Sequence, residues 1–346
     1  MTLLVDGIVF SLQPQGGISV YFRELLQRLR RDAVPTLLTL DGALQQAAPD
    51  SGCAMATLGR PARLLERYRN CRVPPGIQTT VFHSTYYRHP SHALPSVVTV
   101  HDFTYERFAH GPRRWIHSAQ KLAAIRAAEA VVCVSQATMD DLVEFVGLRA
   151  EQTAQVVPNG VSEAFQPQSV DAAARPFVLF VGQRGGYKNF DLALHAMQHL
   201  PDLELLCVGG GELKTTEVAE MPGAVRPRVR HAGFVSDAQL NTLYNQAQCL
   251  VYPSRYEGFG IPVAEAMRAG CPVVSIDCKA VRETGGDALT IAEDEPSAFA
   301  VAILRTAMAS HRIDSVSRGY AVAARYNWED NYQAMRALYR KLACAT

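Results

Sequence analysis

The sequence has no long hydrophobic run and almost no excess of charge. No apolar stretch approaches the roughly 20 residues that a membrane-spanning helix needs, so we expect no transmembrane segment. The formal net charge of +1 over 346 residues gives no overall field that would attract nucleic acid. The opening stretch MTLLVDG lacks basic residues and reaches Asp6 at once, which is not the pattern of a secretory signal. We therefore expect a cytoplasmic protein without a nucleic-acid partner.

Paired cysteine spacings are also absent. The eight cysteines include no C-x-x-C pair, which argues against a zinc ribbon or a thioredoxin-like redox site. Cys133, Cys207 and Cys249 lie inside apolar runs, where a thiol packs as a small hydrophobic group. These features are consistent with a reducing compartment.

Short apolar runs alternate with helical patterns along most of the chain. In the first half, strands are predicted at 3–5, 79–83, 97–101, 130–135 and 154–157, and helices near 18–29, 113–128 and 136–146. In the second half, strands are predicted at 177–182, 203–210, 229–234, 249–254 and 272–276, and helices near 189–200, 236–247 and 261–269. Strands that are apolar throughout are typical of parallel sheets covered on both faces. The sequence therefore predicts an α/β fold.

A polar stretch without periodicity, residues 158–176, separates the two alternating runs and is predicted to be a linker. Beyond the second run, a final helix has an apolar stripe that includes Trp328, Tyr332 and Tyr339. Such a stripe needs a partner surface, so we expect this helix to dock on the body of the protein. The predicted domains are residues 1–165, joined by a crossing helix at about 327–346, and residues 166–326, each doubly wound and Rossmann-like.

The segment SRYEGFGIPVAEAMRAGCPVVS, residues 254–275, places Glu257 and Glu265 on the two sides of a predicted helix start. Backbone amides at a helix N-terminus favour anions, and a carboxylate can accept two hydroxyl hydrogen bonds at once. This layout suits a ligand with a phosphate in the middle and a diol on each side, such as a nucleotide sugar. The alternative is that one glutamate caps the helix and the other is a loop charge; the spacing alone does not decide between them.

This segment resembles the retaining nucleotide-sugar glycosyltransferases of GT-B architecture, family 4, group 1 type, and among them lipopolysaccharide and O-antigen mannosyl- and rhamnosyltransferases. The resemblance implies two Rossmann-like domains facing each other across a cleft. It also implies that Glu257 contacts sugar hydroxyls and that Glu265 holds the ribose diol. The backbone of Phe259, Gly260 and Ile261 would contact the sugar and the phosphate.

A second motif, FVGQRGGYKNF at 180–190, runs from a strand through a glycine-rich turn into a helix. Lysine is a compact cation suited to a diphosphate, although a solvated turn with an incidental base is the simpler interpretation of such a pattern. The resemblance favours the functional interpretation: it assigns Lys188 and Arg184 to the diphosphate, and it adds Gly182 and Asn189 to the nucleotide-sugar site.

The remaining candidates follow predicted strands or precede helices. His101 ends the strand 97–101, at the edge where open α/β sheets bind ligands, and the resemblance places it against the donor sugar. His83 is a weaker candidate for acceptor contact. The resemblance further implicates Gly16 and Gly17, ahead of the helix near 18–29, in a loop that faces the diphosphate and the acceptor. Two more candidates for the nucleotide site are Gly209 and Phe234.

The predicted activity is transfer of a sugar, with mannose or a related deoxysugar favoured and GDP as the favoured nucleotide. The acceptor would be a glycan hydroxyl or a polyprenyl-diphosphate-linked glycan in cell-surface polysaccharide or lipopolysaccharide biosynthesis. We expect no cofactor and no metal, since no Asp-x-Asp motif occurs. A nucleotide-sugar epimerase of the same architecture is the alternative. A dehydrogenase is disfavoured, because no G-x-G-x-x-G follows the first strand.

The stretch GRPARLLERYRNCR, residues 59–72, holds five arginines against Glu66 alone, a net charge of five minus one, +4. Leu64, Leu65 and Tyr68 interrupt the arginines, and a second basic cluster surrounds Trp115. A solvated helix face is one interpretation of this pattern. The other is contact with an anionic membrane surface, which would place the protein at the inner face of the membrane as a peripheral protein.

Overall fold

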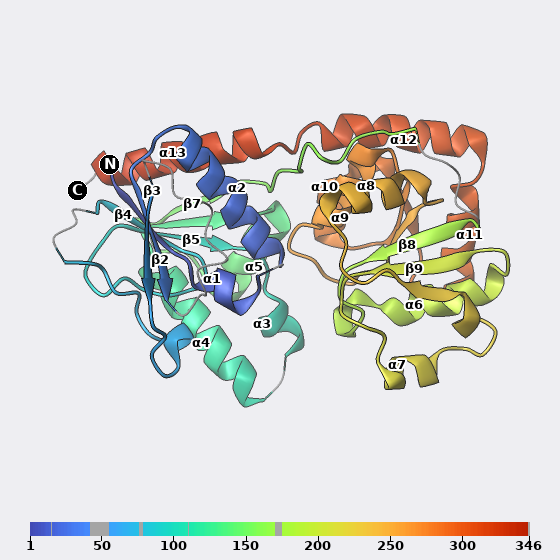
Figure 1. Cartoon of the computed structure of the whole chain (residues 1–346), viewed down its shortest axis with the longest axis horizontal. Helices are drawn as coiled ribbons and strands as arrows, with labels where there is room; N and C mark the ends of the chain where they lie inside the picture. Colours follow the sequence, from blue (N-terminus) through green and yellow to red (C-terminus); the bar gives the residue numbers. More distant parts are fainter. Residues whose placement is uncertain (15, 42–54, 76–78, 110, 170–174, 345–346) are drawn as a thin grey trace. The chain divides into compact units, whose positions relative to one another are not determined.

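The computed structural model describes residues 1–14, 16–41, 55–75, 79–109, 111–169 and 175–344, which fold as two compact units (Figure 1). Unit 1 comprises Met1–Gly160 and Trp328–Thr346, and unit 2 comprises Val161–Asn327. The chain therefore divides at 160/161 and at 327/328, where the sequence predicted 165/166 and 326/327. Residues 158–169 and 175–176 of the expected linker contain neither helix nor strand.

Unit 1 is built on one fully parallel sheet with the order β3-β2-β1-β4-β5-β6-β7. Its strands are β1 (Leu3–Asp6), β2 (Thr36–Asp41), β3 (Met55–Arg60), β4 (Val81–Ser84), β5 (Ser96–Val100), β6 (Ala130–Cys133) and β7 (Thr153–Val156). Its helices are α1 (Ile8–Leu12), α2 (Gly17–Arg31), α3 (Thr104–Phe108), α4 (Pro112–Ala127), α5 (Gln136–Phe145) and α13 (Trp328–Cys344). This strand order is that of a doubly wound sheet, with its switch point between β1 and β4.

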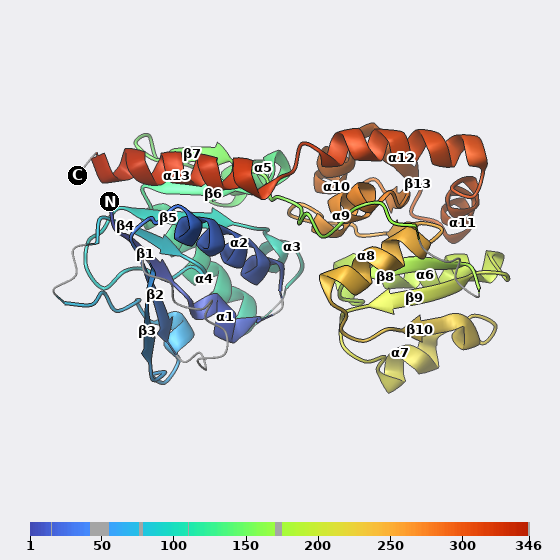
Figure 2. The same cartoon turned by 45° about the horizontal axis from the view of Figure 1, so that its top comes forward.

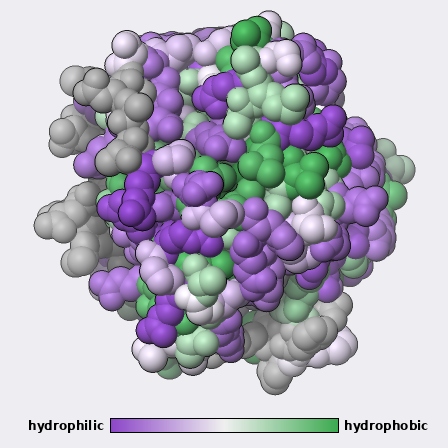
Figure 3. Space-filling model, turned by 90° about the vertical axis from the view of Figure 1, so that its right-hand side faces the viewer, coloured by the Kyte–Doolittle hydropathy of each residue, from purple (hydrophilic) through white to green (hydrophobic). Residues whose placement is uncertain are grey.

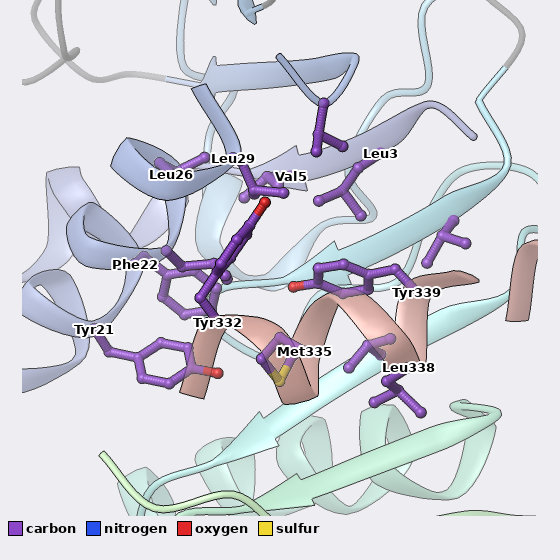
Figure 4. Packing of buried hydrophobic residues seen from close by; sticks show 14 of the residues in the cluster. Leu3, Val5, Tyr21, Phe22, Leu26, Leu29, Tyr332, Met335, Leu338 and Tyr339 are labelled. Carbon is purple, nitrogen blue, oxygen red and sulfur yellow. The ribbon is translucent and has the colours of Figure 1, made fainter. Parts of the chain in front are cut away.

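Helices α2 and α13 lie beside each other and form the larger core of unit 1 (Figures 1 and 2). Tyr332, Met335 and Tyr339 of α13 are fully buried against Leu3 and Val5 of β1 (Figure 4). Side chains alternate across a strand, so the intervening Leu4 of β1 enters a smaller cluster instead of this core. Both faces of the sheet are thus covered, as its continuous apolar strands require.

Unit 2 is a second fully parallel sheet, with the order β10-β9-β8-β11-β12-β13. Its strands are β8 (Phe177–Val181), β9 (Glu204–Val208), β10 (Val229–His231), β11 (Leu250–Tyr252), β12 (Val273–Ile276) and β13 (Leu289–Ala292). Its helices are α6 (Phe190–Ala196), α7 (Thr215–Glu220), α8 (Asp237–Gln246), α9 (Ile261–Ala269), α10 (Lys279–Gly285), α11 (Pro296–Arg305) and α12 (Ala309–Ala323). The switch point of this sheet lies between β8 and β11.

The core of unit 2 also follows strand periodicity. Val178 and Phe180 of β8 pack with Phe190 of α6 and Phe299 of α11 in the main cluster. Helices α11 and α12 and the turn between them retain exposed apolar side chains, which include Val301 and Leu304 of α11, Met308 of the turn and Ile313 of α12. Figure 3 views the right-hand side of Figure 1, where α11 and α12 lie, and shows hydrophobic side chains gathered among hydrophilic ones. Across the residues that the structure describes, no helix combines the length and apolar character that crossing a bilayer demands.

The α/β fold class is confirmed, but three strands were not predicted from the sequence. β2 contains threonines and leucines, which do not distinguish strand from helix, although all six residues are buried. β3 is an edge strand with only Met55 buried, so it has little apolar signal. β13 has a single buried residue, Thr290. Local composition was uninformative in each case, and pairing with a neighbouring strand defines the element.

Candidate functional site

The candidate site of unit 2 lies at one edge of its sheet. All strands are parallel, so the loops that follow β8, β9, β11 and β13 leave the sheet at the same edge. Three of these loops hold residues predicted from the sequence: Lys188 after β8, Gly209 after β9 and Glu257 after β11. Residues that are far apart in the sequence are therefore collected in one place.

Lys188 and Glu257 form an ion pair at this edge. The Lys188 Nζ atom lies 2.6 Å from Glu257 Oε1, and the two side chains are 14% and 11% exposed. The ammonium also lies 5.3 Å from the centre of the Tyr187 ring and 5.6 Å from that of Tyr252, distances at which aromatic faces attract cations. A positive charge is thus held in a partly desolvated position next to a carboxylate.

The second glutamate, Glu265, lies in the second turn of α9 and contacts α8. Its Oε2 accepts a hydrogen bond of 3.1 Å from the hydroxyl of Tyr244. Burial raises the pKa of the Glu265 carboxyl to about 7, against a smaller opposing effect of the Tyr244 hydrogen bond. Sequence patterns did not identify Tyr244, because it lies 21 residues from Glu265 on a different helix.

The segment between the two glutamates is held in place by contacts of Phe259 with other parts of unit 2. The Phe259 ring is buried and lies edge-on to the Tyr326 ring at 5.2 Å, and the Phe259 carbonyl accepts a 2.6 Å bond from the Thr284 hydroxyl. Gly260 adopts φ +96°, a conformation that favours glycine. Helix α9 begins at Ile261. The amides at this helix start have no intrahelical acceptors and form the end that favours an anion.

Arg184, which the sequence predicts to contact the diphosphate, is held by several protein groups. Its guanidinium is buried and bonds Glu217 Oε1 at 3.0 Å. It also donates to the carbonyl oxygens of Gly209 at 3.0 Å, Gly211 at 2.9 Å and Glu212 at 2.8 Å. In the structure this cation holds the loop that follows β9, and its contact with a diphosphate stays a prediction.

The loop that Arg184 holds is made possible by glycines. Gly209, Gly210 and Gly211 all have φ between +73° and +76°, where other residues are strained. A Cβ atom on Gly210 would lie 2.7 Å from the carbonyl oxygen of Gly182. Gly182 therefore lies against this loop, and its amide donates a 2.9 Å bond to the carbonyl of Val208, the residue before Gly209.

Asn189 also contacts protein. Its Nδ2 donates to Asp294 Oδ1 at 2.8 Å, and Arg255 Nε donates to Asp294 Oδ2 at 2.7 Å. Asp294 therefore links the loop of Lys188 with the loop of Glu257, and it was not identified from the sequence. Phe234, predicted as part of the nucleotide site, is 69% exposed.

The remaining predicted residues belong to unit 1. His101 follows β5, and its ring lies edge-on to that of Tyr21 in α2, with 5.2 Å between ring centres. Burial lowers the pKa of His101 to about 4, so the imidazole is neutral at pH 7. Its Nε2 is buried and has no hydrogen-bond partner within the described part of the chain. Gly16 is the N-cap of α2 and Gly17 its first residue.

The prediction that His83 contacts the acceptor was wrong. His83 is fully buried beneath α13, where Nδ1 lies 2.6 Å from the Tyr339 hydroxyl and Nε2 lies 3.0 Å from the Thr99 hydroxyl. Both ring nitrogens therefore have protein partners. His83 is a core residue that joins α13 to the sheet.

Within the described ranges, no group of three or more histidine, cysteine, aspartate and glutamate side chains is arranged to hold a metal ion.

Two family models match the chain in succession. Residues 15–165 match the model described as Glycosyltransferase Family 4, and residues 175–308 match the one described as Glycosyl transferases group 1. The first match lies in unit 1 apart from its last five residues, and the second lies entirely in unit 2.

Individual proteins that are similar to this chain are consistent with these two family models. The chain is 25% identical to the O-antigen chain mannosyltransferase B of Escherichia coli, over 93% of this chain and 96% of that protein. It is 29% identical to the GDP-mannose:cellobiosyl-diphosphopolyprenol alpha-mannosyltransferase of Xanthomonas campestris, over 69% and 66%. The solved structure of Anabaena HepE in complex with UDP-glucose superposes with a TM-score of 0.74 at 16% identity, over 99% and 100%.

Proposed function

Because the chain belongs to the family 4, group 1 glycosyltransferases of GT-B fold, we propose that it transfers a sugar from a nucleoside diphosphate to a glycan hydroxyl with retention of anomeric configuration. The observation that carries this proposal is the sheet edge of unit 2. There the Lys188–Glu257 pair lies in the loops that follow β8 and β11, and the second of these loops leads into α9, which carries the half-buried Glu265 in its second turn. The epimerase alternative is not favoured, since the matching models describe transferases.

The bond that breaks joins the anomeric carbon to a phosphate oxygen. Negative charge grows on the departing diphosphate while the sugar gains oxocarbenium character. Lys188 and the amides at the start of α9 supply fixed positive partners for this charge, and such preorganised donors are worth about 3–4 kcal/mol each. Arg184 supports the site indirectly, by holding the loop 209–212. No metal is needed in this scheme.

The hydroxyl groups of the donor would be recognised by carboxylates and by one imidazole. Glu257 would accept hydrogen bonds from the sugar and Glu265 from the ribose. His101 is neutral and has an unsatisfied Nε2, so it can bond one sugar hydroxyl. The acceptor oxygen would bond the anomeric carbon while its proton passes to the leaving phosphate. No protein side chain would become covalently attached to the sugar.

We infer a GDP-linked mannose or related deoxysugar as the donor. Both curated relatives described above are named mannosyltransferases, and the name of one of them contains GDP-mannose. The solved structure of the Anabaena protein is a complex with UDP-glucose, so uridine nucleotide sugars are the competing class of donor. A polyprenyl-diphosphate-linked glycan is the proposed acceptor, supported by the name of the Xanthomonas relative.

A panel of nucleoside diphosphates and nucleotide sugars, tested by thermal shift, checks the donor proposal. We expect nucleotides of the GDP series to raise the melting temperature most. A ligand present at 100 times its dissociation constant adds about 2.7 kcal/mol to the free energy of unfolding. At a pH above the raised pKa of about 7 of the Glu265 carboxyl, Glu265→Gln should weaken binding about 10-fold, since bonds to an ionised acceptor are the stronger ones. Glu220→Gln, at the exposed end of α7, is the matched control. No stabilisation by any nucleotide would overturn the proposal.

A surface of unit 1 suggests how such an acceptor is reached. Leu64, Leu65 and Tyr68 are 81%, 64% and 43% exposed, and they lie among the arginines of 60–72. The structure pairs Arg63 with Glu66 and Arg72 with Asp41, which reduces the charge available to a partner. We propose that the apolar residues enter an anionic membrane surface while the remaining arginines contact lipid headgroups, at about 1 kcal/mol for each.

Co-sedimentation with vesicles tests this contact. We expect the protein to bind vesicles containing phosphatidylglycerol and to remain in solution with phosphatidylcholine alone. Leu64→Glu should abolish most of the binding, whereas Ile313→Glu, at a similarly exposed apolar position on α12, should not change it. Indifference to anionic lipid, or equal loss in both variants, would refute the membrane contact and leave the nucleotide site untouched.

A further inference from the structure

Tyr244 presents a hydroxyl to the site from a rigid, buried position. The residue lies in α8 and is fully buried, and its ring lies edge-on to Phe165 with 5.8 Å between ring centres. Its hydroxyl donates the 3.1 Å hydrogen bond to Glu265 Oε2. The pKa of the Tyr244 phenol is raised well above its usual range, by burial and then by the Glu265 charge. The phenol therefore remains a donor at every pH at which the protein is handled.

The carboxylate of Glu265 has one oxygen held and one free. Among the residues that the structure describes, the Tyr244 hydroxyl is the only hydrogen-bond partner of this carboxylate. The other charged group near it, Asp237 at the start of α8, is acidic and disfavours its ionisation. Nothing else in the described part of unit 2 donates to the side chain. The phenol is thus the protein group that both orients the carboxylate and favours its charged form.

We propose that Tyr244 is a positioning residue, which fixes Glu265 so that its carboxylate accepts both hydroxyls of the donor ribose. This inference rests on the proposed function, because it takes the ribose as the ligand of Glu265. A carboxylate that binds a vicinal diol must turn both oxygens toward the two hydroxyls, so the rotation about its last bond must be fixed; the Tyr244 bond uses one of the four lone-pair sites of the carboxylate and leaves sites on both oxygens for the ribose. The hydrogen bond from the hydroxyl of the fully buried Tyr244 fixes this rotation and leaves Oε1 available to the ribose.

The role predicts a coupling between the tyrosine hydroxyl and the ribose hydroxyls. Tyr244→Phe keeps the ring and removes only the donor. The variant should bind the nucleoside diphosphate found in the panel about 10-fold more weakly than the unmodified protein. It should bind the 2′,3′-dideoxy form of the same nucleotide as tightly as the unmodified protein does, because that ligand makes no use of Glu265. Isothermal titration calorimetry measures all four affinities.

A matched control separates positioning from general loss of stability. Tyr332 in α13 is also fully buried, and its hydroxyl donates to a carboxylate, Asp32 Oδ2, at 2.9 Å, but it lies in unit 1. Tyr332→Phe should lower the melting temperature to a similar degree and leave both nucleotide affinities unchanged.

The possible outcomes are distinguishable. Equal weakening of both nucleotides by Tyr244→Phe, or no weakening of either, would overturn the positioning role while the nucleotide site stands. A loss confined to the nucleotide that carries ribose hydroxyls would support it. An unmodified protein that binds neither nucleotide would overturn the proposed function, and the inference with it.

Discussion

Lys188→Ala should lower the turnover number by about 100-fold or more, because removal of one preorganised charge from a developing anion has an effect of this size. Lys188 is the cation held at the sheet edge by Glu257 and by two tyrosine rings. The donor bond cannot break without charge appearing on the diphosphate. Steady-state kinetics with the donor identified by the panel would measure the change in kcat and in KM separately.

The alanine variant also leaves Glu257 without its partner, so a second comparison is needed. Lys188→Arg keeps the positive charge and should retain more activity than Lys188→Ala, although a planar guanidinium does not replace a compact ammonium fully. Lys341→Ala, at an exposed position of α13, is the control for a lysine outside the site and should match the unmodified protein. Turnover by Lys188→Ala within a few-fold of normal would exclude Lys188 from the stabilisation of the leaving group.

Arg88→Met should destabilise unit 1 by about 3–5 kcal/mol, the usual effect of removing one partner from a buried ionic cluster. The Arg88 side chain is fully buried and contacts three carboxylates: Asp6 at 3.0 Å, Asp41 at 3.0 Å and Glu66 at 2.8 Å. Methionine fills part of the space but leaves these acids without their shared cation. The loss is a large fraction of the 5–15 kcal/mol that stabilises a typical domain.

Urea unfolding followed by tryptophan fluorescence is a direct measurement of this loss. The chain has two tryptophans, Trp115 and Trp328, and both belong to unit 1. Trp328 is 4% exposed in the native state, so its emission reports unfolding of that unit. Arg31→Met, which breaks an exposed pair with Glu329 in the same unit, should cost less than about 1 kcal/mol. Similar midpoints for both variants would show that the buried cluster does not stabilise unit 1.

The amphipathic helices were predictable because one face of each carries a continuous apolar pattern. Phe22 and Leu26 of α2 lie four residues apart and Tyr332 and Tyr339 of α13 lie seven apart, which is helical spacing, and all four are buried in the same core. The strands β8 and β11 were predictable because each lies in a short run that is apolar throughout. In these elements, local pattern and tertiary burial agree, and the sequence contains enough information.

Arg184 and His83 show the limit of residue type as evidence. A guanidinium suits a diphosphate and a ring of carbonyl oxygens equally well, and an imidazole at a strand end can face a ligand or a tyrosine. The structure surrounds Arg184 with the loop 209–212 and places His83 beneath Tyr339. No pattern within the local sequence could distinguish these environments, because the partners of both residues come from other elements.

The sequence by itself determined the α/β class, most strands of the two sheets and the motif with Glu257 and Glu265, since strand burial and helix starts depend on neighbouring residues. Only the tertiary structure decided which groups meet. Lys188 reaches Glu257 across 69 residues, and Tyr244 reaches Glu265 from another helix. The physical reason is that a hydrogen bond or an ion pair forms over about 3 Å of space, and the separation of two residues along the chain does not specify that distance.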